Sequence, residues 1–129
     1  MSRNARVDAR LAFTAQQRLR RKADFDSVHA HGTRIADGYF AVIARANDVV
    51  RPRLGLAVSV KTAGSAVERN RIRRVIRESF RLHQRELPAL DIIVSARSRA
   101  RGAASGELRA SLETLWKKVR ERCAASPPS

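Results

Sequence analysis

Residues 66–84 read AVERNRIRRVIRESFRLHQ, and this stretch decides the fold because its apolar residues have the spacing of an amphipathic helix. With a turn of about 100° per residue, one face of this helix carries Ile72, Val75, Ile76, Ser79 and Phe80. The opposite face carries Arg69, Asn70, Arg73, Arg74, Arg77 and Arg81. The sequence therefore predicts a helix that buries one face and presents arginines on the other.

The arginines on this helix form a ladder. Steps of four residues rise by ~6 Å, so the ladder from Arg69 to Arg81 is about 18 Å long. Guanidinium groups match phosphate geometry with paired hydrogen bonds, which favours Arg over Lys for this task. Glu78 is the one acid on this face and could orient Arg74 and Arg81. A merely solvated charged face is the alternative, but too few acids balance the arginines, which favours phosphate binding.

The sequence around this helix predicts an α+β domain. A short helix is expected at 23–30 and a final helix, with an apolar stripe, at 105–122. Apolar and β-branched runs at 39–46 and 53–60 predict two strands joined as a hairpin, and 90–96 supplies another strand. Helices and strands in this order indicate a single α+β layer structure.

The length of 129 residues suits one domain, expected at residues 18–123. Residues 1–17 are expected to be a flexible N-terminus, and residues 124–129 a disordered tail, because both ends are small, polar or Pro-rich. Cys123 is the single cysteine, which excludes an intrachain disulfide and suggests a reducing compartment such as the cytoplasm.

The charge balance indicates a polyanionic partner. Lys and Arg number 27 against 12 Asp and Glu, a net charge of +15, which is the electrostatic pattern of nucleic-acid binders. An anionic membrane is the competing polyanion, but no apolar stretch approaches the ~20 residues that a spanning helix needs. A DNA-binding basic helix is also disfavoured, because neither a leucine zipper nor a helix-turn-helix pair precedes the arginine helix.

Two parts of the arginine helix, 66–74 (AVERNRIRR) and 77–81 (RESFR), resemble the RNR signature of the protein subunit of bacterial ribonuclease P. The resemblance covers roughly residues 18–120. It includes these further segments: 19–25 (LRRKADF), 52–56 (PRLGL), 58–61 (VSVK), 87–88 (LP) and 91–94 (DIIV). It implies an αβββαβα sandwich, like the second domain of a small-subunit ribosomal protein, with a left-handed β-α-β crossover. General topology rules predict the opposite hand.

The resemblance also implies a function. In this family the RNA subunit cleaves precursor tRNA with bound Mg²⁺, so the chain would be the protein subunit of a ribonucleoprotein endoribonuclease, with no catalytic residue and no metal site of its own. Its partners would be the catalytic RNA and the precursor tRNA. The RNA-binding residues would be Arg69, Asn70, Arg71, Arg73, Arg74, Arg77 and Arg81. The cleft for the 5′ leader would be lined by Phe25, Phe40, Ser59 and Lys61.

Some positions depart from the family pattern or allow another interpretation. His29 and Ile43 stand where family members often have an aromatic residue, and Val60 stands where they often have Lys, so weaker leader binding is expected. Phe25 and Phe40 could instead be core residues. Tyr39 should face the opposite side of its strand from Phe40, and we expect Phe40 to face the cleft.

Other functions are less consistent with the residues. A protein nuclease would need clustered carboxylates, but the acids are scattered. His29 and His31 lack a third metal ligand nearby. An RNA-binding module of the ribosomal-protein type has the same charge and fold class, and only the RNR signature argues against it.

Overall fold

The computed structural model describes residue 18, residues 21–47 and residues 51–124. The predicted flexible N-terminus at 1–17 lies outside the described residues. The same holds for the predicted tail, apart from Ala124, at which the last helix ends.

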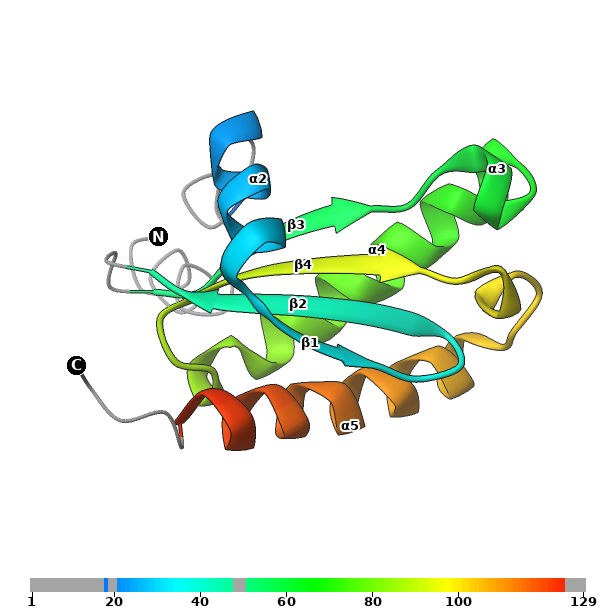
Figure 1. Ribbon diagram of the computed structural model, residues 1–129. Coiled ribbons are helices and arrows are strands. Elements are labelled where there is room, and N and C mark those ends of the chain that lie inside the picture. Colours follow the sequence, from blue (N-terminus) through cyan, green and yellow to red (C-terminus); the bar gives the residue numbers. More distant parts are fainter. Residues whose placement is uncertain (1–17, 19–20, 48–50, 125–129) are drawn as a thin grey trace, which may run out of the picture.

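The domain has one four-stranded sheet with helices on both faces (Figure 1). The helices are α2 (Lys22–His31), α3 (Val60–Ala63), α4 (Ala66–His83) and α5 (Ser105–Ala124). The strands are β1 (Thr33–Ala36), β2 (Phe40–Ala46), β3 (Arg53–Ala57) and β4 (Leu90–Ala96). Short 3₁₀ turns occur at Gln84–Glu86 and Ser98–Ala100. The strand order is β1-β2-β4-β3, which confirms the predicted α+β class.

The predicted hairpin between residues 39–46 and 53–60, which correspond to β2 and β3, is wrong. Strand β2 pairs antiparallel with β1 and β4, whereas β3 pairs parallel with β4. The physical reason is that Leu90–Val94 of β4 is buried at every position and apolar except at Asp91, and a strand of this kind takes the centre of a sheet covered on both faces. The true hairpin joins β1 to β2, and the Oδ1 atom of Asp37 holds its turn by accepting the N–H groups of Tyr39 and Phe40, each at 2.9 Å.

The connection from β3 through α4 to β4 is left-handed. In Figure 1 both strands run from left to right, β4 lies below β3, and α4 returns behind the sheet, which is the rarer hand for a crossover between parallel strands. The crossover places α4 next to α5 on one face, while α2 crosses the other face (Figure 1).

Each face of the sheet has its own apolar contacts. Alternate residues of β2 and β4 pack against α4 and α5 in the larger core, which includes Val42 and Ile92. The residues between them, Ile43 and Ile93, pack against Val28 of α2. The alternation is that expected of strands with two covered faces.

Candidate nucleic-acid interface

Helix α4 starts from two local features of the sequence. Gly64 has φ +96°, a conformation that favours glycine, and it separates α3 from α4. The Oγ atom of Ser65 then accepts the N–H of Glu68 at 3.1 Å and caps the first turn. The predicted buried face is confirmed, because its members are all buried: Ile72, Val75, Ile76, Ser79 and Phe80.

The outer face of α4 forms a basic hollow of about 380 Å³. Its lining residues are Arg18, Asn70, Arg74, Arg77, Glu78 and Arg81. Arg81 pairs with Glu78, as predicted. Partial burial and the neighbouring charges of Arg73 and Arg18 lower the pKa of Arg77. Positive charge is therefore concentrated here, and an anion that neutralised it would be bound favourably.

Three of the predicted RNA-binding residues, Arg69, Arg71 and Arg73, do not line this hollow. Arg69 is half-buried at the border of the packed face, and its Nε atom is buried. Arg71 points to the opposite flank, where its guanidinium donates hydrogen bonds to Glu68, Ala103 and Ser105 at 2.7–3.0 Å. The structure thus brings Asn70, Arg74, Arg77 and Arg81 together, with Arg73 beside them.

A second candidate surface lies on the face of the sheet that α2 covers in part. One cross-strand row of this face, here called the small-residue row, consists of Ala36, Ala41, Ser95 and Ala57 in register. The row shares the face of Ile43 and Ile93 because residues two apart in a strand point the same way. Its side chains are exposed or half-buried, so they leave a shallow floor beside α2.

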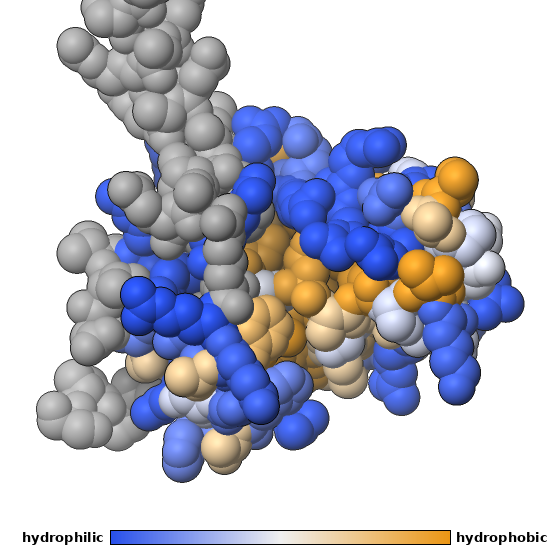
Figure 2. Space-filling view, turned by 90° about the horizontal axis from the view of Figure 1, so that it is seen from above, coloured by the Kyte–Doolittle hydropathy of each residue, from blue (hydrophilic) through white to orange (hydrophobic). Residues whose placement is uncertain are grey.

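The walls of this floor come from α2 and α3. Phe25 of α2 is half-buried against Ile43 and Ile93. Ser59 and Lys61 are exposed at the start of α3, where the Oγ atom of Ser59 accepts the N–H of Thr62 at 3.1 Å. Figure 1 shows α2 and α3 at opposite ends of β3. Figure 2, which looks down on the molecule from above that view, shows an apolar strip with hydrophilic side chains on either side.

The prediction that Phe40 lines the cleft is wrong. Its side chain is 0% exposed and belongs to the core formed with α4 and α5. Tyr39 does not replace it, because it packs beside that same core and its hydroxyl donates to Glu107 of α5 at 2.9 Å. The predicted opposite facing of Tyr39 and Phe40 is also wrong, because β2 begins at Phe40 and Tyr39 precedes the strand, where it packs against the same core.

Two arginines near the candidate surfaces were not predicted from the sequence. Arg18 lines the hollow of α4, although α2, α3 and three strands lie between it and that helix in the sequence. Arg97 is exposed just beyond β4, where it donates to the carbonyl of Asp37 at 3.1 Å. Neither had a local signal, because both positions are set by long-range strand pairing.

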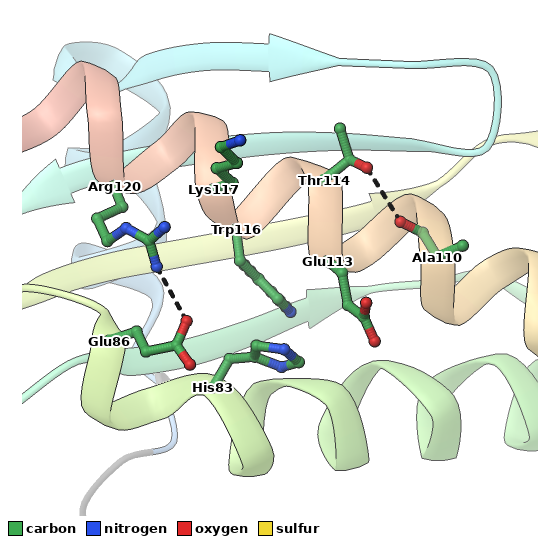
Figure 3. A pocket seen from close by; sticks show the side chains of 8 residues that line it. All are labelled: His83, Glu86, Ala110, Glu113, Thr114, Trp116, Lys117 and Arg120. Carbon is green, nitrogen blue, oxygen red and sulfur yellow. Dashed lines mark hydrogen bonds and ion pairs between the residues drawn. The ribbon is translucent and has the colours of Figure 1, made fainter.

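A different hollow, of about 450 Å³, lies between the end of α4 and α5. Figure 3 shows His83 and Trp116 on facing helices and an ion pair from Arg120 to Glu86, 2.9 Å long, across the gap. Its two glutamates nearly balance Lys117 and Arg120, whereas four arginines and a single glutamate line the arginine hollow.

Across the described ranges, no group of three or more His, Cys, Asp or Glu side chains is placed to hold a metal ion. None of the helices in the described part of the chain is long and apolar enough to cross a membrane.

Comparison with known proteins identifies the family. The family model for ribonuclease P matches residues 13–120. The chain is 41% identical over 114 residues to the ribonuclease P protein component of Methylococcus capsulatus, with coverage of 88% of this chain and 89% of that one. The corresponding protein of Pseudoalteromonas atlantica is 39% identical over 115 residues, covering 89% and 96%.

Solved structures have the same fold. The Staphylococcus aureus RNase P protein superimposes with a TM-score of 0.74 at 38% identity, covering 78% of this chain and 93% of that one. The RNase P protein from Thermotoga maritima gives a TM-score of 0.70 at 33% identity, covering 78% and 96%. With its arginine helix, its left-handed crossover and these relatives, the chain belongs to the ribonuclease P protein family.

Proposed function

We propose that the chain binds the catalytic RNA of ribonuclease P through the outer face of α4 and holds the 5′ leader of precursor tRNA on the small-residue row. The proposed reaction is the Mg²⁺-dependent endonucleolytic removal of the leader, which forms the mature 5′ end of the tRNA. The observation that carries the proposal is the basic hollow of α4 in a chain of this family.

The hollow suits a folded RNA. Four arginines and one glutamate line it, and the glutamate pairs with Arg81. Arginine forks bind phosphate oxygens with two hydrogen bonds, so Arg74 and Arg77 can each engage a phosphate. Release of the RNA counterions would supply much of the affinity.

The small-residue row suits a single strand. A floor of Ala and Ser side chains allows a nucleotide to approach the sheet closely, and Lys61 supplies a positive charge at one end. Phe25 packs against the cluster of Val28, Ile43 and Ile93 and is only half-buried, so part of its ring is available for one base. Stacking of a base on an aromatic side chain contributes about 1–3 kcal/mol and tolerates any sequence.

In this proposal the catalytic Mg²⁺ ions are held mainly by the RNA and the substrate. The part of the chain that the structure describes has no grouping of acidic or His side chains suited to a metal. The residues of the protein would neutralise phosphates and position the leader. The hydrolytic step itself would be performed by the RNA.

Reconstitution tests this proposal. The purified protein alone should not cut precursor tRNA, and the protein with its cognate RNA and Mg²⁺ should cut at the mature 5′ end at low salt. Cleavage by the RNA-free protein after nuclease removal would refute it. Sequencing the RNA that co-purifies should give one abundant structured species, whereas a random mixture would favour a general RNA-binding module.

A further inference from the structure

Arg71 is one of the predicted RNA-binding residues that lie outside the basic hollow. Its guanidinium makes four hydrogen bonds within the protein: Nε and one terminal nitrogen donate to the two carboxylate oxygens of Glu68, at 2.8 and 2.7 Å. The others go to the carbonyl of Ala103 at 2.8 Å and to Oγ of Ser105 at 3.0 Å. A guanidinium has five N–H donors, so little capacity remains for a phosphate.

Glu68 completes the clamp. Its carboxylate also accepts the N–H of Gly102 at 2.7 Å. Gly102 has φ +76°, a conformation that side chains disfavour, so the turn at 101–104 is shaped to meet this carboxylate. Together Glu68 and Arg71 fasten the first turns of α4 to the loop between β4 and α5.

The same loop holds α3. Arg101, next to the clamped Gly102, donates to the carbonyls of Lys61 and Thr62 at 3.2 and 3.4 Å. Its side chain lies against Gly64, where an added Cβ would be 2.8 Å from its Nε atom. The contact satisfies carbonyls at the end of a helix only four residues long and places a positive charge there.

These contacts form a continuous series from α4 to α3. The clamp of Arg71 and Glu68 fixes residues 102–105, the adjacent Arg101 fixes α3, and α3 carries Lys61 and begins at Ser59. We infer that Arg71 is a positioning residue, which sets the place of α3 beside the small-residue row and does not itself bind RNA. The inference rests on the proposed function in one respect, namely that α3 helps to hold the leader.

The two arms of the series allow a sharp test. Arg71→Ala removes the clamp, and Arg101→Ala keeps the clamp but disconnects α3. In the assembled protein–RNA complex, both variants should speed amide hydrogen exchange at Ala63 and Gly64, whose N–H groups bond to Ser59 and Val60 within α3. Both should also reduce the preference for leader-bearing over leaderless substrate by about 2- to 30-fold.

The double variant should lose no more of this preference than the stronger single variant, because the two residues act in series. Arg120→Ala serves as the matched control, since it breaks an ion pair to Glu86 far from α3 and should change neither readout. If Arg71→Ala proves too unstable to assemble, Arg101→Ala alone still tests the link between the loop and α3.

The outcomes separate the inference from the proposed function. If the unmodified protein shows no preference for leader-bearing substrate, the leader site itself is refuted, and the role of Arg71 toward it falls with it. If that preference exists and both variants retain it, with unchanged exchange in α3, only the positioning role is refuted. A drop in the salt dependence of RNA binding in Arg71→Ala, equal to that of Arg74→Ala, would make Arg71 a phosphate contact and also overturn the inference.

Discussion

The indole Nε1–H of Trp116 donates a hydrogen bond of 2.8 Å to Oγ of Ser79, and both side chains are buried between α5 and α4. Phe80, next to Ser79, meets the Trp116 ring edge-on, with centroids 6.1 Å apart. This explains why a serine occupies the apolar face of α4. The hydroxyl satisfies an indole N–H that water cannot reach.

Ser79→Ala should therefore destabilise the domain by about 1–3 kcal/mol, since it leaves a buried donor without a partner. Urea unfolding would measure the loss. Thr114→Ala is the control, because it removes an exposed hydroxyl on α5 and should change stability by less than about 0.5 kcal/mol. Equal stability of the two variants would mean that the buried hydrogen bond has no net effect.

The arginines in and beside the hollow should contribute to the salt dependence of RNA binding. Each neutralised phosphate adds to the slope of log affinity against log salt, by about −0.7 per contact for a single strand. Each of the variants Arg73→Ala, Arg74→Ala and Arg77→Ala should make the slope shallower by the amount that one phosphate contact contributes, without unfolding the protein.

Arg120→Ala, on α5 in the other hollow, should leave that slope unchanged. Binding titrations at several salt concentrations would decide this. An unaltered slope in the variants of Arg73, Arg74 and Arg77 would show that these arginines are solvated in the complex.

Acid stability should depend on Glu68. Hydrogen bonds from Arg71 and the Gly102 amide lower its pKa from 4.5 to about 2. A lowered carboxyl pKa stabilises the folded state above the unfolded value and ceases to do so as the pH falls toward the folded value. The stability difference between the unmodified protein and Glu68→Gln should therefore be constant above about pH 4.5.

Below that pH the difference should shrink, and it should level off near pH 2. Arg81 likewise lowers the pKa of Glu78, but that contribution is present in both proteins and cancels in the difference. Urea titrations at a series of pH values would measure this. A difference that stayed constant down to pH 2 would contradict the lowered pKa.

The sequence predicted those features that depend on local periodicity. Helix α4 and its buried face follow from apolar residues at helical spacing, and the extent of β4 follows from the run LDIIVSA. The class of fold followed from the order of these elements, and the left-handed crossover followed only from the resemblance to a family.

Local periodicity could not predict which strands pair over long distances in the sequence. Strand β1, with the sequence TRIA, has one buried side chain, Ile35, and gives little periodic signal. Without β1, the run at 39–46 was paired with 53–60, its neighbour in the sequence, which produced the wrong hairpin and the wrong facing of Phe40. The hydrogen bonds of Arg71 within the protein could not be predicted either, because its partners at Ala103 and Ser105 lie more than thirty residues away in the sequence.

Phe25 and Phe40 provide the final prediction, because both were assigned to one cleft and the structure separates them. Phe40→Ala should cost about 3–5 kcal/mol of stability, as expected for a fully buried aromatic side chain. It should weaken the binding of leader-bearing and leaderless substrates alike, because less of the protein is folded.

Phe25→Ala should behave differently, because its ring is half-buried against Ile43 and Ile93 at the edge of the small-residue row. It should weaken binding of precursor with a 5′ leader by about 1–3 kcal/mol if one base stacks on the ring, and leave binding of mature tRNA unchanged. Affinities for the two substrates, measured beside urea unfolding of each variant, separate the two effects. If Phe25→Ala lost several kcal/mol of stability and weakened both substrates equally, Phe25 would be a core residue, and the leader would have to be held by α3 and the strand floor without an aromatic platform from α2.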